Sequence, residues 1–187
     1  MSIPPDAKND ERTFSAPPLL IALVTILIVG FAVVPRLFKP QEGELVGKPA
    51  PDFTLNVVIN SLADGKPAVT LSELRGQAVV LDFWATWCGP CQAEAPIVNK
   101  VAQRYKDRGL VVIGVNTSDN EQKARAWAAQ RGLSFPIVFD ANDATARAYG
   151  VENLPTLVVV SRSGNIIAVR TGMTDDAELE ALVKQAL

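Results

Sequence analysis

The chain has 187 residues, of which 48% are hydrophobic and 20% charged, and its formal net charge is −2. This length allows one domain of ordinary size with an appendage, and the apolar fraction is sufficient for a core. The slightly acidic balance offers no basic field for a nucleic acid partner. Two cysteines cannot form the disulfide framework of a small secreted domain, although they can form one bridge.

A long apolar run near the amino terminus predicts a membrane anchor. Residues 19–34 contain no charged side chain, and twelve of these sixteen residues are Leu, Ile, Val or Phe. They favour the bilayer by about 5 kcal/mol, and as a helix they are ~24 Å long, so Leu37 and Phe38 are needed to extend the span. We therefore predict a tail over residues 1–18 and a single transmembrane helix over residues 19–38.

Two other interpretations of this run stay open. Gly30 and Ala32 resemble the small residues of a signal-peptide cleavage site, and so short a run also suits a buried core helix. The anchor is favoured because the run is longer than the apolar part of a usual signal peptide, and because the acid-rich leader is a poor start for one. Basic residues lie on both sides of the run, so they do not predict its orientation.

The rest of the chain predicts a linker and one domain. Residues 39–49 are polar and rich in Pro and Gly, and a folded domain is expected over residues 50–187. It begins with a hairpin, because two strand-like segments flank Asp64 and Gly65. Further strands are predicted over residues 78–84, 110–116 and 135–140 and in a hairpin over 156–170. Helices are predicted over residues 90–108, 119–132, 143–150 and 174–187, the last with Thr174 as its N-cap.

The order of these elements predicts the fold class. Strands and helices alternate through the middle of the domain, which indicates parallel strands, and the final hairpin adds antiparallel ones. Residues 78–84, AVVLDFW, are apolar almost throughout, as expected of a strand covered on both faces. We therefore predict an α/β fold in which helices flank a mixed β-sheet.

The two cysteines, Cys88 and Cys91, are spaced as C-x-x-C in a chain without histidine. A structural zinc site needs four nitrogen or sulfur ligands, and an iron–sulfur cluster needs four thiolates. Attachment of a c-type haem needs histidine directly after the second cysteine, where this chain has Gln92. No metal and no cofactor is therefore predicted, and redox chemistry remains.

The position of the pair supports a redox role. It follows the predicted strand over residues 78–84 and opens a helix, so the helix dipole and free N–H groups favour a thiolate at Cys88. We predict that Cys88 attacks a disulfide and that the more buried Cys91 resolves the mixed disulfide. The alternative is a bridge that only staples the chain, although so small a loop gives little entropic stabilisation.

The segment DFWATWCGPC, residues 82–91, resembles the active site of thioredoxins, and the resemblance extends over residues 50–187. The segments GKPAPDFTL, VIGVNTSDN and YGVENLPTLVVVSRSGNII are more specific. They resemble the membrane-anchored, extracytoplasmic thioredoxin-like proteins of bacteria, the TlpA/ResA/CcmG (DsbE) group. The resemblance implies a thioredoxin-like fold and a catalytic domain on the outer side of the cytoplasmic membrane. It also implies a protein-disulfide reductase that often serves cytochrome c maturation.

The resemblance also implies a set of site residues. Pro155 would be the cis-proline across from the cysteines, and Asp82 the buried acid that moves the proton of Cys91. Glu94 would be an acid that tunes the cysteine pKa. For Asp82 a locally satisfied carboxylate, and for Glu94 a surface position in the first helical turn, stay as alternatives. No lysine accompanies Asp82, because its place on the next strand falls at Gly114. The expected substrate-binding residues are Trp87, Gly89, Pro90, Leu154 and Pro155, and the expected disulfide joins Cys88 and Cys91.

Three functions remain to be compared. The favoured one is a membrane-tethered reductase of protein disulfides, with apocytochrome c among its possible substrates. Such a reductant needs a membrane thiol donor of the CcdA/DsbD type. A peroxidase of the peroxiredoxin class is disfavoured, because its P-x-x-x-[ST]-x-x-C pattern would require Pro and Ser or Thr where this chain has Leu81 and Ala85. A module that binds thiols without turnover is the third.

Overall fold

The computed structural model describes residues 45–62 and 64–187. The predicted tail, the predicted transmembrane helix and most of the predicted linker lie outside these residues. Within the described part of the chain, no helix is both long enough and apolar enough to cross a membrane.

Strands and helices alternate along the described chain in the predicted order. The strands are β1 (Thr54–Ile59), β2 (Ala68–Thr70), β3 (Ala78–Trp84), β4 (Leu110–Thr117), β5 (Ile137–Asp140), β6 (Thr156–Val160) and β7 (Ile166–Thr171). The helices are α2 (Gly89–Tyr105), α3 (Glu121–Arg131), α4 (Ala144–Ala148) and α5 (Asp176–Ala186), with short 3-10 helices η1 (Leu71–Leu74) and η2 (Lys106–Arg108).

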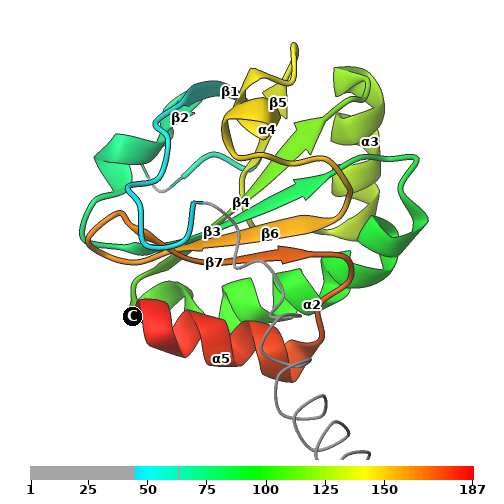
Figure 1. Cartoon of the computed structure of the whole chain (residues 1–187). Helices are drawn as coiled ribbons and strands as arrows, with labels where there is room; N and C mark the ends of the chain where they lie inside the picture. The colour runs from blue at the N-terminus through cyan, green and yellow to red at the C-terminus, as the bar shows by residue number, and fades with distance from the viewer. Residues whose placement is uncertain (1–44, 63) are drawn as a thin grey trace, which may run out of the picture. The chain divides into compact units, whose positions relative to one another are not determined.

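The strands form one mixed sheet in the order β2-β1-β5-β4-β3-β6-β7 (Figure 1). Strand β3 pairs parallel with β4, and β4 pairs parallel with β5. Strands β6 and β7 add antiparallel to the other side of β3, and β1 and β2 add antiparallel beyond β5. The predicted α/β fold with a mixed sheet and flanking helices is confirmed, and it is the thioredoxin-like arrangement.

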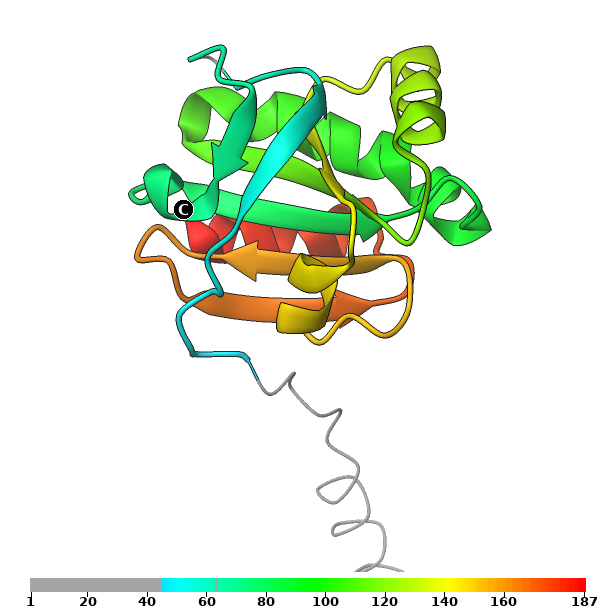
Figure 2. The ribbon, with the colours of Figure 1, turned by 90° about the horizontal axis from the view of Figure 1, so that it is seen from above.

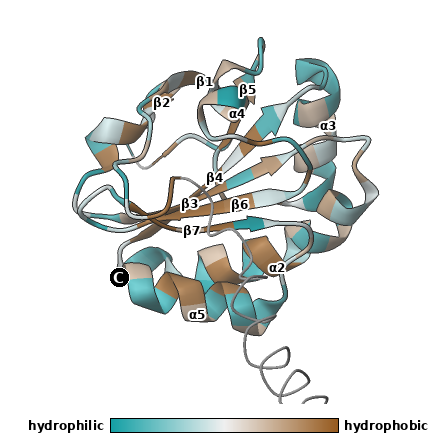
Figure 3. Ribbon diagram, in the orientation of Figure 1, coloured by the Kyte–Doolittle hydropathy of each residue, from teal (hydrophilic) through white to brown (hydrophobic). Residues whose placement is uncertain are grey.

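Helices cover both faces of this sheet. Helices α2, α3 and α5 form a core with one face of the sheet, whereas α4 and η1 pack on the opposite face of the sheet (Figures 1 and 2). In the described part of the chain, hydrophobic residues gather in the central strands, and the helices carry polar residues on their outer sides (Figure 3). All seven residues of β3 are buried, as the apolar run AVVLDFW predicted.

The alternation of side chains along β3 decides which groups meet under α2. Val79, Leu81 and Phe83 belong to the core with α4, whereas Val80 and Trp84 belong to the core that also contains both cysteines. Because successive side chains of a strand point to opposite faces, Asp82 lies on the same face as Val80 and Trp84. The carboxyl group therefore faces the helix that begins at the cysteines.

Two boundaries differ from the sequence-based expectation. Gly47 and Ala50 donate hydrogen bonds to the carbonyl oxygens of Ile166 and Gly164, at 2.8 and 2.9 Å, so ordered structure begins before residue 50. The expected N-cap Thr174 was wrong. Asp175 is the N-cap of α5 and accepts the Glu178 N–H at 2.8 Å, because the helix begins at Asp176, one residue later than expected.

Candidate active site

The two cysteines form a disulfide at the amino-terminal end of α2. Cys88 and Cys91 are joined by a bond of 2.01 Å, with their Cα atoms 5.3 Å apart. Cys88 is the N-cap of the helix, and its sulfur accepts the Cys91 N–H at 3.2 Å. A sulfur at an N-cap receives the free N–H groups and the positive end of the helix dipole. The position predicted from the sequence for the attacking cysteine is therefore confirmed.

Burial does not separate the two cysteines as expected. Each is 4% exposed, so Cys91 is not the more buried one. The reason is that the disulfide holds both sulfur atoms within one turn of α2, at the same depth. What distinguishes them is their place in the helix, because only Cys88 stands at the N-cap.

The expected substrate-binding residues lie in two segments, the start of α2 and the turn before β6. The Leu154–Pro155 peptide bond is cis, as the resemblance implied. Gly89 and Pro90 form the exposed first residues of α2. Trp87 is 64% exposed, whereas Trp84 is buried in the core. The residues implied by the resemblance thus lie at the start of α2 and in the segment before β6.

A groove begins at Trp87, the residue before Cys88. It has a volume of about 470 Å³ and lies between Trp87 and Leu154, with Ser118, Asp143 and Arg147 along its walls. The segment from 143 to 154 follows β5, and Trp87 follows β3. Because β5 pairs parallel with β4 and β4 pairs parallel with β3, the loops after these strands lie at the same edge of the sheet. A groove of this size can hold a stretch of peptide next to the redox site.

Asp82 is a buried carboxyl group with little compensation. It is 5% exposed, and its Oδ1 has no hydrogen-bond partner among residues 45–62 and 64–187. Burial raises the pKa of Asp82 well above its ordinary value, and the nearby Glu94 carboxylate raises it further. The alternative of a locally satisfied carboxylate is not what the structure shows. Such a group can hold a proton near neutral pH, when exposed carboxyls have lost theirs.

Glu94 is a second buried carboxyl group on the inner face of α2. It is 1% exposed, one turn after Cys91, so the alternative of a surface residue does not apply. Its Oε1 accepts the Thr174 N–H at 2.7 Å, whereas Oε2 has no partner in the described part of the chain. Burial raises the pKa of Glu94, and the hydrogen bonds from Thr174 partly offset this effect.

No cation from the neighbouring strand compensates these acids. Asp82 lies opposite Gly114 in the β3–β4 register, as the sequence indicated. A side chain at Gly114 would also lack room, because a Cβ there would lie 2.5 Å from the Ile137 side chain and 3.1 Å from the Trp84 indole nitrogen. Burial is therefore the main cause of the raised pKa of Asp82, and the charge of Glu94 adds to it.

The loop before the cysteines is held by a residue that sequence reasoning missed. Asp119 accepts the Thr86 N–H at 2.5 Å and the Thr86 hydroxyl at 2.9 Å, and it also accepts the Asn116 amide at 3.1 Å. Burial raises the pKa of Asp119, but these hydrogen bonds outweigh it and hold the pKa below its ordinary value. The sequence could have indicated this contact, because Asp119 follows β4 and Thr86 follows the neighbouring parallel strand β3. Residues that follow two such strands lie at the same edge of the sheet.

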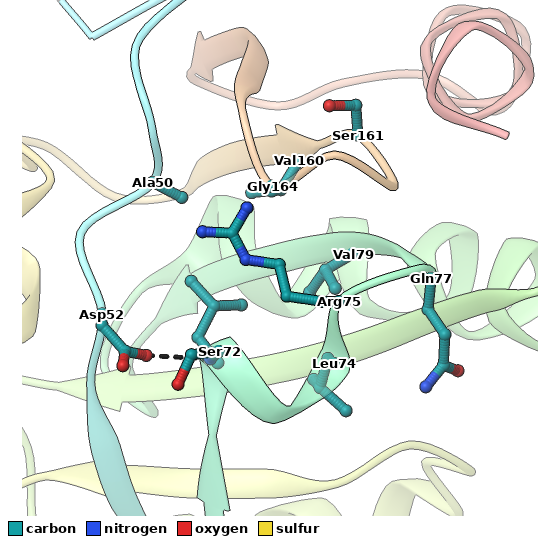
Figure 4. Close-up of a pocket in the computed structure, with 11 residues that line it drawn as sticks. Ala50, Asp52, Ser72, Leu74, Arg75, Gln77, Val79, Val160, Ser161 and Gly164 are labelled. Carbon is teal, nitrogen blue, oxygen red and sulfur yellow. Dashed lines mark hydrogen bonds between the residues drawn. The ribbon is translucent and has the colours of Figure 1, made fainter.

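A second cavity lies at the other end of β3 and is a poor candidate for the site (Figure 4). It is lined by Asp52, Ser72 and Arg75 and by Val79 at the start of β3, whereas the cysteines follow the end of this strand. Its volume is about 20 Å³, which is room for about one water molecule. The chemistry therefore belongs to the carboxyl end of β3.

Comparison with known proteins agrees with this geometry. Residues 45–184 match the Redoxin family. The chain belongs to the Redoxin family. It is 33% identical over 160 residues to the thiol-disulfide oxidoreductase ResA of Geobacillus kaustophilus, covering 86% of this chain and 88% of that protein. It is 32% identical over 171 residues to ResA of Bacillus anthracis, covering 89% and 95%.

The solved structures give the same assignment. A thiol:disulfide interchange protein of the thioredoxin family from Chlorobium tepidum superimposes with a TM-score of 0.65 at 28% identity. The match covers 74% of this chain and 94% of that one. The resemblance to the TlpA/ResA/CcmG group is thereby confirmed. With its C-x-x-C disulfide at a helix N-terminus, this Redoxin family member is a thiol–disulfide oxidoreductase.

Proposed function

We propose that this protein is a reductase of protein disulfides that works outside the cytoplasm, tethered by the apolar segment over residues 19–38. The observation that carries the proposal is the Cys88–Cys91 disulfide at the start of α2, above two buried carboxyl groups. A bridge that only stapled the chain would need neither acid, and burying them is costly. The structure holds the oxidised form, which is the product of one turnover.

In the first step, the reduced Cys88 thiolate attacks one sulfur of a substrate disulfide. The substrate S–S bond breaks, a mixed disulfide forms with Cys88, and the departing substrate sulfur leaves as a thiolate that takes up a proton. The Cys91 N–H, which here donates to the Cys88 sulfur, stabilises the attacking thiolate. Trp87, Gly89 and Pro90 would contact the substrate chain, and Leu154 before the cis-proline Pro155 would align it.

In the second step, Cys91 loses its proton and attacks the Cys88 sulfur. The mixed disulfide breaks, the second substrate sulfur leaves as a thiolate that takes up a proton, and the Cys88–Cys91 bond closes. Two electrons have then passed from the protein to the substrate. We assign the proton of Cys91 to the Asp82 and Glu94 pair, because both carboxyls face this part of the core with an unpartnered oxygen among the described residues.

The two acids are expected to differ in their roles. Glu94 already binds the Thr174 N–H through Oε1, whereas no hydrogen bond to Asp82 is found among the described residues. Asp82 is therefore the better proton carrier, and Glu94 raises its pKa. Asp82→Asn should slow the second step and remove from its pH profile the rise in rate that follows loss of the Asp82 proton, whereas Glu94→Gln should move that rise to lower pH. Equal profiles for wild type and Asp82→Asn would contradict this assignment.

The direction of electron flow is proposed from the Gly89-Pro90 dipeptide between the cysteines, which resembles that of reducing thioredoxins. A reductant outside the cytoplasm must be reduced again, so a membrane thiol donor of the CcdA/DsbD type is the expected partner. Apocytochrome c is the proposed substrate, by similarity to the group.

The reduction potential tests the direction. Equilibration of the full-length chain with glutathione buffers should give a potential below about −200 mV, whereas a value near −120 mV would identify an oxidant. Catalysis is tested with Cys91→Ser, which should accumulate mixed disulfides with its substrates through Cys88. A module that only binds thiols would retain partners without a covalent bond, and that result would reject the enzyme.

The tether and the side of the membrane need their own test. Cell fractionation should recover the full-length chain with the membrane, and an added protease should digest residues 45–187 from outside the cytoplasmic membrane. Recovery in the soluble fraction of a chain shortened at its amino terminus would support the cleaved signal peptide.

A further inference from the structure

The Asp143 side chain does not cap the helix that it precedes. Asp143 stands at the N-cap of α4, where an aspartate usually accepts a backbone N–H of the first turn, yet it makes no such bond. Asp140 takes over this role, because its carboxylate accepts the Thr145 and Ala146 N–H groups at 3.2 and 2.9 Å. The Asp143 carboxylate is therefore available for contacts outside α4.

These contacts all reach the end of β4 and the residue after it. Asp143 accepts the Thr117 hydroxyl at 2.6 Å, the Ser118 N–H at 2.7 Å and the Ser118 hydroxyl at 3.1 Å. The hydrogen bond from Thr117, those from Ser118 and the charge of Arg147 lower the pKa of Asp143. The carboxylate is thus ionised at neutral pH, and both of its oxygens accept hydrogen bonds.

Ser118 has an unusual backbone that needs this support. It adopts φ 52°, in the left-handed region, and Asp143 itself adopts φ 55°. Residues with a side chain seldom occupy this region unless their surroundings hold them there. The carboxylate of Asp143 supplies such a hold, because it binds both the backbone and the side chain of Ser118.

Ser118 in turn fixes the largest exposed side chain beside the disulfide. Its carbonyl oxygen accepts the Trp87 indole N–H at 2.9 Å. Trp87 directly precedes Cys88 and forms one wall of the groove of about 470 Å³. With most of its surface in solvent, the indole has few packing contacts to fix it, so this hydrogen bond sets its direction.

We propose that Asp143 is a positioning residue. Through the left-handed backbone of Ser118 it holds the Trp87 indole in place as one wall of the groove, and so keeps the groove open for a substrate peptide. This inference rests on the proposed function, because it assumes that the peptide chain of a disulfide substrate docks beside Cys88. It assigns a role in substrate specificity to the N-cap of α4, a helix that contributes no cysteine and no proton carrier.

The test compares Asp143→Asn with Asp107→Asn in the full-length chain. Asparagine also tolerates a left-handed backbone, so the first variant removes only one acceptor oxygen and the charge. Asp107 is exposed in η2, at the far end of α2 from Cys88, and controls for the loss of one surface charge. The substrates are insulin, whose interchain disulfides are reduced, and a small aromatic disulfide that has no chain to dock.

Asp143→Asn should raise the KM for insulin about fivefold, as expected from the loss of one hydrogen bond, and change kcat less than twofold. The Trp87 indole proton, assigned with Trp87→Phe, should exchange with deuterium about tenfold faster, because the rate follows the opening of its hydrogen bond. The equilibrium with glutathione should not change, and Asp107→Asn should match the wild type in every measurement.

Unchanged KM and unchanged indole exchange in folded Asp143→Asn would overturn the proposal. An equal loss of rate with insulin and with the small disulfide would also overturn it, because the variant would then act on the cysteines. If Asp143→Asn does not fold, Ser118→Ala, which removes a single bond to the carboxylate, should show the same changes at smaller size. A wild type inactive on both disulfides would reject the proposed function instead, and the indole exchange would still test the Asp143 contact.

Discussion

Polar groups near the two ends of the central strand β3 differ in whether they have hydrogen-bond partners. At its amino end, around the small cavity of Figure 4, Asp52 accepts the N–H groups of Phe53 and Ser72, at 3.0 and 2.9 Å. Arg75 donates to the Ser163 carbonyl oxygen. At its carboxyl end, an oxygen of Asp82 and an oxygen of Glu94 are buried without a partner among the described residues.

This difference separates structural polar groups from functional ones. Buried polar groups that only stabilise a fold are almost always hydrogen bonded, so unpartnered ones need an explanation. Around the cysteines the explanation that we propose is proton transfer, which requires a carboxyl that can exist with and without its proton. The amino end of β3 is predicted to matter for stability alone, and the carboxyl end for activity at a cost in stability.

The largest effect is expected at the carboxyl end. Cys88→Ala should lower the rate of insulin reduction at least about 10³-fold, because the nucleophile is lost. The midpoint of thermal unfolding should stay close to that of the reduced wild type, since both lack the disulfide. Turnover by this variant within tenfold of the wild type would remove Cys88 from the mechanism.

Asp82→Asn should make the protein more stable at alkaline pH. The folded-state pKa of Asp82 is raised, so its contribution to stability is complete below the unfolded pKa and is lost as pH rises through the folded pKa. The variant should gain about 2 kcal/mol in the free energy of unfolding at pH 9, and much less at pH 4. Denaturant titrations at both pH values measure the gain, and a loss at pH 9 would mean that the Asp82 carboxylate is satisfied.

Gly164→Ala probes the amino end. Gly164 adopts φ 84°, and a Cβ there would meet the Arg75 guanidinium. The variant should lose about 1 kcal/mol of unfolding free energy, because alanine is strained in a left-handed backbone. The glutathione equilibrium should be unaffected. A changed equilibrium would show that the two ends of β3 are coupled.

The smallest effect, with the opposite pH dependence to Asp82→Asn, is expected for Asp52→Asn. Burial raises the pKa of Asp52, but hydrogen bonds with Ser72 and Phe53 and the charge of Arg75 outweigh it and lower the pKa. Stability from this group is present above the unfolded pKa and is lost as pH falls through the folded one. Because Asp52 is exposed and screened, the variant should lose only about 0.5 kcal/mol at pH 7. The loss should vanish near pH 2 in acid titrations of unfolding.

The sequence by itself determined the local features of this protein. The run AVVLDFW predicted a strand buried on both faces, and the C-x-x-C after it predicted a redox pair at a helix start, with Cys88 at the N-cap. These follow from nearest neighbours in the chain, because period, capping and burial of a single strand are written in a few consecutive residues. Even the place of Gly114 opposite Asp82 followed from aligning two adjacent parallel strands.

Tertiary structure decided how the acids and the groove are held. Glu94 could equally have been a surface residue of the first helical turn, and it is buried because the segment before α5 closes over it and donates the Thr174 N–H. Asp143 had the position of an ordinary helix N-cap, and only the approach of Ser118 redirects its carboxylate. Both contacts join residues far apart in the chain, 80 positions in the first case and 25 in the second. No local pattern contains such contacts, because the packing of whole elements brings these residues together.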